Sequence, residues 1–309
     1  MSKVMVFGSF VVDLMARTPH LPIAGETVHG SMFKMGAGGK GFNQCVAAHK
    51  AGADVTMVTK LGRDVFGDVA LRTMAELQMP KDRLLYSEDH ETGIALILVD
   101  ERTSQNEIVI VPGACATITP EEVRRLEPLI GESEYVLLQL EVNQDANELV
   151  AEIAQRAGCK VIVNTAPFSP LSDAFLSRVY MVTPNEVEAE QLTGVRVDSF
   201  ASAKKAAAFF YEKGVKKVII TLGERGVFVS SDGREEIVPA FHVQAVDTTG
   251  AGDAFNGGLL AALSENADIW EAARFASALA ALSVQRLGTT PSMPTRREID
   301  AFLKARTTA

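Results

Sequence analysis

Short runs of β-branched residues recur along the chain, and their pattern limits the possible folds more than any other feature. KVIVN at 160–164 and KVIITLG at 217–223 contain continuous apolar stretches, with no alternation of apolar and polar residues. Strands need this pattern when helices cover both faces of their sheet. We therefore predict a mostly parallel sheet. Its expected strands are Lys3–Phe10, Val55–Leu61, Tyr135–Leu140, Lys160–Asn164, Val179–Thr183 and Val218–Leu222.

Segments with helical periodicity separate these strands. Strands that alternate with helices in this way, joined by right-handed crossovers, predict an α/β fold with a doubly wound sheet. No internal repeat or long linker divides the chain, so we expect residues 1–309 to form a single domain. The expected helices include Asn43–Ala51, Pro120–Leu129, Asp145–Ala157, Ala201–Lys213, Asp253–Leu263 and Ile269–Val284.

Two segments, residues 11–36 and 93–111, interrupt the alternation. GIALILVD and EIVIV flank the polar turn ERTSQN, as the strands of a hairpin do. Strands that leave the main sheet near its N-terminal region and again before Gly113 could meet over its carboxyl edge, where open α/β sheets bind ligands. We predict that they form a small antiparallel β lid over a cleft.

Charge and cysteine content exclude several classes of protein. Thirty Lys and Arg stand against 39 Asp and Glu, so the net charge of −9 argues against a broad surface for nucleic acid or anionic membrane. No apolar stretch reaches the roughly 18 residues of a membrane span, and no export signal is evident at the start. Cys45, Cys115 and Cys159 are widely spaced and odd in number, so they indicate neither a disulfide framework nor a CxxC metal site. We expect a cytoplasmic protein.

The segment Asp247–Asp253, DTTGAGD, is a glycine-rich turn that leads into an Ala- and Leu-rich helix. The small residues Gly250, Ala251 and Gly252 allow backbone N–H groups to face one point, and the helix dipole adds positive charge there. Such a turn suits a phosphate. A carboxylate at Asp253 could then accept the proton of an attacking hydroxyl. Alternatively, Asp253 only caps the helix.

A second glycine-rich segment, GAGGKG at 36–41, matches GxGxxG. A dinucleotide site requires an acidic residue at the end of the next strand, but VTMVTKLG ends without one, and the GxxxxGK[ST] pattern is absent too. The segment is therefore interpreted as a loop that approaches a polyhydroxylated ligand, with Asn43 nearby. An ordinary turn is the alternative.

Two further segments follow strands. Asn185 and Glu188 are three residues apart on one helical face, and such a pair can hold water around Mg²⁺. Without further context, an ordinary acid-rich helix start is the favoured alternative. Residues Thr221–Gly226 could pass beneath a nucleotide or form only a turn.

Four segments together resemble the ribokinase (phosphofructokinase B-like) family of carbohydrate kinases: GGKGFNQ at 38–44, TPNEVEAE at 183–190, TLGERG at 221–226 and DTTGAGDAFNGG at 247–258. The likeness covers nearly the whole chain in order and spacing, and the DTxGAGD element is its most specific part. It implies ATP-dependent phosphorylation of a sugar hydroxyl. Asp253 would be the catalytic base, and Gly250, Ala251, Gly252 and Asp253 would form the anion hole.

The resemblance also implies binding positions and a homodimer formed through the lid. On the nucleotide and Mg²⁺–phosphate side they are Asn185, Glu188, Thr221, Gly223, Gly226, Gly252 and Ser277. On the sugar side they are Val11, Asp13, Gly39, Lys40, Asn43, Glu141 and Asp253. A monovalent cation, K⁺, would lie at Asp247, Thr249, Ser283, Arg286, Gly288 and Ser292, several of them acting through backbone carbonyls.

The sugar side departs from the family pattern at two positions. GSFVVD carries Val11 where ribokinases have Asn in GSxNxD, and Phe42 replaces a small residue. An apolar wall favours a sugar that lacks a hydroxyl there, and deoxyribokinases are also apolar at the position of Val11. Such a wall rejects an added hydroxyl only by roughly 10². We therefore expect phosphorylation of O5 of ribose or 2-deoxyribose, with ribose still accepted.

Other functions stay open at this point. A kinase for another sugar or for a nucleoside would need the same phosphate machinery. A non-catalytic sugar sensor could share the fold, but the intact Asp253, Gly250 and Gly252 argue against it. ADP release that depends on added sugar would separate a kinase from a sensor.

Overall fold

The main sheet has eight strands in the order β14-β13-β12-β11-β10-β9-β1-β4, and the six strands from β12 to β4 run parallel. The computed structural model describes residues 1–103 and 105–307. Each strand predicted for the parallel sheet has a counterpart in it, but the one expected at Val55–Leu61 ends at Val58, and Lys60 and Leu61 belong to a separate two-stranded sheet. The parallel strands are β1 (Val4–Phe7), β4 (Val55–Val58), β9 (Tyr135–Leu138), β10 (Lys160–Val163), β11 (Met181–Val182) and β12 (Lys217–Thr221).

An antiparallel hairpin, which the sequence analysis did not predict, extends one edge of this sheet. It consists of β13 (Val227–Ser231) and β14 (Arg234–Val238), with β13 antiparallel to β12. Asp232 and Gly233 connect its strands, with φ of 51° and 79°. Two-residue hairpin turns favour Asp-Gly because they need positive φ. The Asp232-Gly233 dipeptide was therefore the sequence feature that could have predicted this hairpin.

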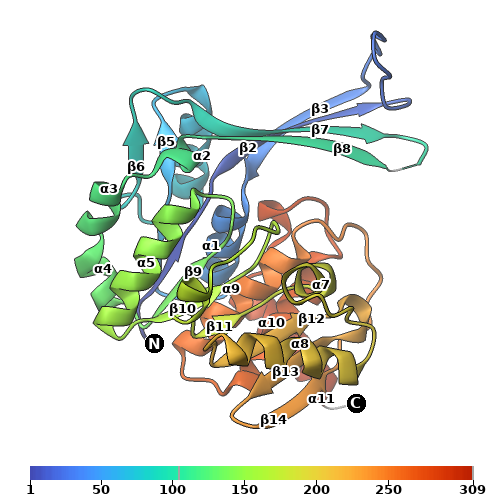
Figure 1. Ribbon diagram of the computed structural model, residues 1–309. Coiled ribbons are helices and arrows are strands. Elements are labelled where there is room, and N and C mark those ends of the chain that lie inside the picture. Colours follow the sequence, from blue (N-terminus) through green and yellow to red (C-terminus); the bar gives the residue numbers. More distant parts are fainter. Residues whose placement is uncertain (104, 308–309) are drawn as a thin grey trace.

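Helices cover both faces of the sheet, which confirms the doubly wound α/β prediction (Figure 1). Side chains alternate along β1: Val4 and Val6 belong to one core, Met5 and Phe7 to the other. The first core is covered by α1 (Lys40–Lys50), α2 (Val65–Glu76), α9 (Ala251–Ser264), α10 (Ile269–Ser283) and α11 (Arg296–Thr307). The second is covered by α3 (Pro120–Arg125), α4 (Glu127–Glu132), α5 (Gln144–Ala157), α6 (Asp173–Leu176), α7 (Glu186–Thr193) and α8 (Phe200–Glu212).

The helix expected at Pro120–Leu129 is divided into α3 and α4. Leu126 ends the first helix and precedes the second, in which Pro128 lies in the first turn. Proline has no N–H to donate and its ring clashes with the carbonyl four residues earlier, so it is tolerated at a helix start but not in an interior. The prediction of one continuous helix was wrong for this reason.

The segments expected to form a lid build a separate four-stranded sheet that projects from the body (Figure 1). Its order is β3-β2-β7-β8, with antiparallel outer pairs and a parallel central pair, β2 with β7. Because β2 begins just after β1, the base of the lid lies at the carboxyl edge of the main sheet. The strands are β2 (Val11–Thr18), β3 (Met32–Gly38), β7 (Thr92–Asp100) and β8 (Asn106–Gly113); a short pair, β5 (Lys60–Gly62) and β6 (Leu85–Ser87), lies beside it.

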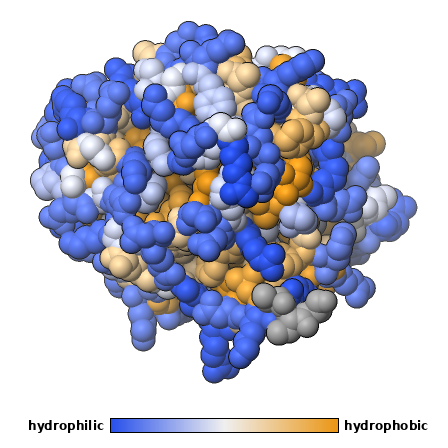
Figure 2. Space-filling model, turned by 90° about the horizontal axis from the view of Figure 1, so that it is seen from below, coloured by the Kyte–Doolittle hydropathy of each residue, from blue (hydrophilic) through white to orange (hydrophobic). Residues whose placement is uncertain are grey.

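The surface is mixed. Seen from below, hydrophilic residues surround several smaller apolar patches (Figure 2). Within the described ranges, no helix has both the length and the apolar character needed to cross a bilayer.

Candidate active site

The turn at Gly250 leaves backbone amides free at the start of α9. Gly250 is the N-cap residue with φ 77°, a left-handed conformation that favours glycine. The amide of Ala251 donates to the carbonyl of Thr248. Across residues 1–103 and 105–307, the amides of Gly250, Gly252 and Asp253 have no acceptor. A Cβ on Gly252 would meet no atom within 4 Å, so open space lies there. Three free amides at a helix N-terminus suit an anion.

Asp253 does not cap its own helix. It lies inside the first turn of α9, is 6% exposed, and its carboxylate accepts hydrogen bonds from a different helix. Gln44 Nε2 donates to Oδ1 at 3.0 Å and Asn43 Nδ2 donates to Oδ2 at 3.0 Å. The capping alternative is therefore wrong. A carboxylate offers about four acceptor sites, so two remain for a ligand.

Charged side chains gather around this carboxylate. Burial raises the pKa of Asp253, while Lys40, Gln44 and Asn43 act in the opposite direction. Burial lowers the pKa of Lys40, but attraction to Asp253, Glu141 and Glu188 outweighs it and the pKa is raised. Lys40 therefore stays an ammonium among several carboxylates.

Asp13 lies at the base of the lid, on β2. Burial, followed by repulsion from Glu141 and then Asp253, raises the pKa of Asp13 to about 6. Glu141 is held by the backbone amide of Lys40 at 2.8 Å and by the hydroxyl of Ser9. The structure thus brings Asp13, Lys40, Asn43, Glu141 and Asp253 into one cluster.

Val11 and Phe42, the two apolar residues predicted on the sugar side, differ in where they lie. Val11 is buried at the start of β2, beside Gly38 and Gly93 in neighbouring strands. Phe42 has no exposed surface, and its ring packs edge-on against Phe10 with centroids 5.0 Å apart. Phe42 belongs to the core and does not line the cluster. The prediction that it contributes to an apolar wall was wrong, because this ring fills the space beneath the loop.

A cavity of about 450 Å³ adjoins the anion-binding turn. Several of its walls are apolar, and Phe241, Val243, Phe255 and Val284 are among the lining residues that the sequence analysis missed. The segment 239–246 has no regular periodicity, and its apolar character was the available signal. The hydroxyl of Ser277 has no hydrogen-bond partner in the described part of the chain. Predicted nucleotide positions lining the cavity are Thr221, Gly223, Gly226, Gly252 and Ser277.

Asn185 and Glu188 lie outside the lining of that cavity and bond to each other at the start of α7. The Asn185 side chain accepts from the Glu188 amide at 2.8 Å, and Glu188 accepts from the Asn185 amide at 3.0 Å. This capping box agrees with the interpretation as an ordinary helix start. Glu188 is nevertheless buried, and burial raises the pKa of its carboxyl.

Asp247 joins the two loops of the predicted cation site. Its Oδ1 accepts from the Thr249 amide and its Oδ2 from the Gly288 amide, both at 2.9 Å. The hydroxyls of Ser283 and Ser292 donate to nearby carbonyls, and Arg286 pairs with Glu298. No group of three or more His, Cys, Asp or Glu side chains among the described residues could hold a metal ion. A cation here would depend mainly on backbone carbonyls.

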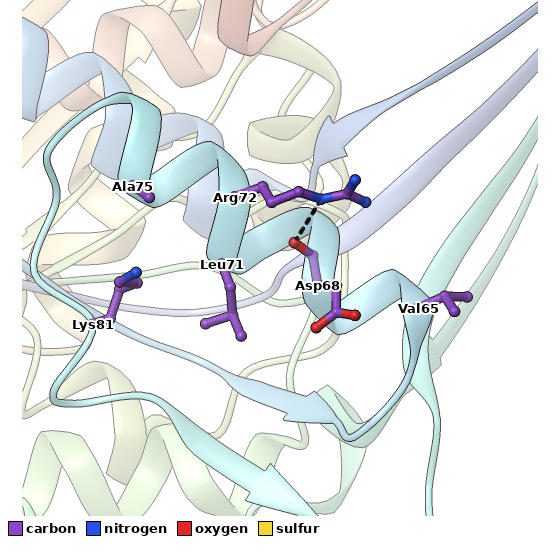
Figure 3. Close-up of a pocket in the computed structure, with 6 residues that line it drawn as sticks. All are labelled: Val65, Asp68, Leu71, Arg72, Ala75 and Lys81. Atoms are coloured by element: carbon purple, nitrogen blue, oxygen red, sulfur yellow. Dashed lines mark hydrogen bonds between the residues drawn. The ribbon is translucent and has the colours of Figure 1, made fainter.

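Another cavity, of about 480 Å³, lies along the outer side of α2 (Figure 3). Arg72 donates to the backbone carbonyl of Asp68 beside it, and Val65 and Lys81 lie at its two ends. It contains none of the predicted site residues. The cavity of about 450 Å³, which reaches the start of α9, is therefore the candidate nucleotide site.

Known proteins resemble this chain over nearly its whole length. A family model described as pfkB family carbohydrate kinase matches residues 1–296. A ribokinase of Haemophilus influenzae is 42% identical over 299 residues, 97% of both chains. A deoxyribokinase of Salmonella typhi is 35% identical over 301 residues, 97% of this chain and 98% of the other.

Solved structures agree. The ribokinase of Arabidopsis thaliana complexed with ribose and ATP has a TM-score of 0.91 at 30% identity, covering 98% of this chain and 99% of that one. A ribokinase from Thermotoga maritima has a TM-score of 0.90 at 36% identity, covering 98% and 100%.

Proposed function

Because the chain belongs to the pfkB family of carbohydrate kinases, we propose that it transfers the γ-phosphate of ATP to O5 of a pentose, ribose or 2-deoxyribose. One observation carries this assignment: the buried Asp253 carboxylate lies in the same helical turn as the free amides of Gly250 and Gly252. A proton acceptor and an anion site in one turn are what transfer of phosphate to an alcohol requires.

The turn at Gly250–Asp253 acts as the anion hole. Phosphoryl transfer passes through a loose transition state with charge spread over the phosphate oxygens, and fixed backbone amides stabilise that charge. Asp253 orients the sugar hydroxyl and accepts its proton as the bond to phosphorus forms. Lys40 lies close enough to Asp253 to attract it, and we assign it to the negative charge that gathers during transfer.

The nucleotide occupies the cavity between Thr221 and Ser277. Its apolar walls suit a purine ring, and the unpartnered hydroxyl of Ser277 suits a polar edge of that ring. Asn185 and Glu188 would hold the water molecules around a Mg²⁺ ion, which prefers few protein ligands. When bound, Mg²⁺ would supply positive charge that neutralises the phosphates. Asp247 and Gly288 close the loop to which we assign an activating K⁺.

Asp13 and Glu141 hold the sugar hydroxyls, with Gly39, Lys40 and Asn43 completing the sugar side. Val11 places methyl groups at the base of the lid, which favours 2-deoxyribose over ribose without excluding ribose. We assign the lid formed by 11–36 and 93–111 to exclude water from the closed site.

Measuring ADP release tests this function. At fixed ATP, Mg²⁺ and K⁺, ribose or 2-deoxyribose should stimulate ADP release far more than fructose or nucleosides do. A preference for a nucleoside or another sugar would change the assigned substrate. Binding of a pentose without any ADP release would favour a sensor. Turnover of ribose greatly above that of 2-deoxyribose would contradict the role given to Val11.

Replacing the proposed base tests the mechanism. Asp253→Asn should lower kcat by at least about 10², the low end for loss of a general base. ATP affinity, measured by calorimetry, should stay near that of the parent protein because the nucleotide cavity is unchanged. Near-normal turnover in this variant would refute the role of Asp253.

We also propose a homodimer formed through the lid, in the cytoplasm. The edge strand β8 exposes a continuous apolar run, Ile108–Val111, and an exposed apolar edge favours pairing with another chain. The three cysteines, all buried, are free thiols, which agrees with a reducing compartment.

A further inference from the structure

Gln44 is a fully buried side chain whose amide makes hydrogen bonds on both ends. Its Nε2 donates to Asp253 Oδ1 at 3.0 Å and to Asn164 Oδ1 at 2.9 Å. Its Oε1 accepts from Gln139 Nε2 at 2.7 Å. Every hydrogen of this amide nitrogen therefore has a partner, and one of those partners is the proposed base.

The direction of this network is set by a backbone atom. Asn164 Nδ2 donates to the carbonyl of Thr183 at 3.1 Å, and a carbonyl oxygen can only accept. The Asn164 amide is thereby oriented with its Oδ1 toward Gln44. Because this oxygen can only accept a hydrogen bond, Gln44 must donate to it through Nε2. Rotating the Gln44 amide by half a turn would set its oxygen against two other acceptor oxygens. Gln44 can present only an N–H to Asp253.

The network lies along the carboxyl ends of three neighbouring strands. Gln139 follows β9, Asn164 follows β10 and Thr183 follows β11. These ends are fixed by the parallel sheet, whereas Asp253 belongs to α9. Gln44, on α1, is the side chain that joins the sheet ends to the carboxylate.

We propose that Gln44 is a positioning residue, whose amide, oriented by Asn164 and Gln139, holds the Asp253 carboxylate ionised and aimed at the incoming hydroxyl. This inference rests on the proposed function, because it assigns to Gln44 an effect on the base that the mechanism requires. Gln44 itself does not touch the reacting atoms.

Several charged groups compete at this carboxylate. Burial raises the pKa of Asp253; the ammonium of Lys40 on α1 lowers it, as do the amides of Gln44 and Asn43. The negative charge of Asp253 in turn raises the pKa of Asp13 on β2 and of Glu188 on α7. Glu141 acts on Lys40 and Asp13. Because burial opposes the ionisation of Asp253, loss of the Gln44 donor should raise the pKa of Asp253 further.

The test is the pH dependence of kcat at saturating ATP and pentose. Gln44→Met fills a similar volume without a donor. The acid limb of its kcat–pH profile should move to higher pH by about one unit, because a hydrogen bond to a charged group corresponds to about one unit of pKa. The plateau of kcat should fall about tenfold through loss of orientation, while KM for ATP should stay within about twofold.

A second variant and a matched control keep the test decisive. Gln44→Glu retains the shape and places a second carboxylate beside Asp253, so its acid limb should move at least as far. Asn147→Leu removes another fully buried amide, one that bonds to the Gln139 carbonyl and does not contact Asp253. It should lower the melting temperature but leave the pH profile in place.

The outcomes separate this inference from the proposed mechanism. A shifted limb in a folded Gln44 variant, with Asn147→Leu unshifted, supports the positioning role. An unshifted limb, or an equal shift in Asn147→Leu, overturns it even if Asp253→Asn is inactive. Near-normal activity of Asp253→Asn would instead overturn the base assignment, and the role of Gln44 with it.

Discussion

The carboxyl group of Asp13 lies directly over the backbone of Gly38. A Cβ added at Gly38 would come within 2.4 Å of Asp13 Oδ1 and 2.5 Å of its Cγ. Gly38→Ala should therefore push the carboxylate out of place. Because a displacement of about 1 Å in a positioned group can cost up to about 10² in rate, we expect KM for the pentose to rise at least tenfold. Initial rates at varied sugar and fixed ATP would measure this.

Gly36 provides the matched control on the same strand. A Cβ there would meet no atom within 4 Å, and its φ is not positive. Gly36→Ala should stay within about twofold of the parent protein. Equal changes of KM in the two variants would contradict the prediction that Gly38 leaves room for the Asp13 carboxylate.

Sugar binding should weaken as the pH falls through the range in which Asp13 is protonated. The pKa of Asp13 is raised to about 6, so the ionised carboxylate that accepts sugar hydroxyls is complete only above about pH 7. The profile of kcat/KM for the sugar reports the free enzyme. The value of kcat/KM should fall below pH 6. In the Asp13→Asn variant, the slope of log kcat/KM against pH on this acid side should be smaller by one, because one fewer group is protonated. An unchanged slope in the variant would contradict the assignment.

The raised pKa of Asp13 should affect folding stability in the opposite direction: sugar binding improves as the pH rises, whereas the contribution of Asp13 to stability declines. The folded pKa of about 6 exceeds the ordinary value of 3.8, so Asp13 favours the folded state fully below about pH 4 and loses that contribution as pH rises through 6. Asp13→Asn removes the cost of burying a charge. It should therefore raise the free energy of unfolding more at pH 8 than at pH 4.5. Urea titrations at the two pH values would show this, and a gain independent of pH would contradict it.

Local pattern was enough to predict the sheet, but not the contacts of the site. Continuous apolar runs such as Val161–Val163 occur because helices cover both sheet faces, and this is a property of each strand alone. The partners of Asp253 lie 209 and 210 residues away in the chain. Nothing in the spacing of Asn43 and Gln44 reveals that their amides meet this carboxylate.

Phe42 illustrates the limit of reading a site from substitutions. A large apolar residue in place of a small one suggests a change in the ligand pocket. In the fold, however, Phe10 lies where the Phe42 ring can pack against it, 32 positions earlier in the chain. The substitution is accommodated in the core, and only three-dimensional packing reveals this.

The lid dimer can be tested at β8. Ile108 is 52% exposed on this edge strand, and Ile108→Asp should dissociate the dimer because it would bury an unpaired charge in the apolar contact. Sedimentation at micromolar concentration measures the change. Val65→Asp, at an exposed aliphatic residue of α2 outside the lid, should leave the dimer intact. A monomeric parent protein, or equal dissociation by both variants, would contradict a lid interface.

Ser277 separates nucleotide binding from stability. Its hydroxyl lines the nucleotide cavity and has no partner in the described residues, so Ser277→Ala removes an unsatisfied polar group. The apoprotein should be as stable as the parent or slightly more so, while KM for ATP rises about five- to tenfold and KM for the pentose does not. Ser264→Ala is the control, because that buried hydroxyl donates to the Ala261 carbonyl at 2.7 Å. It should cost about 1 kcal/mol of stability without changing KM for ATP. If Ser277→Ala destabilised the apoprotein and left KM for ATP unchanged, the hydroxyl would serve the fold and not the nucleotide.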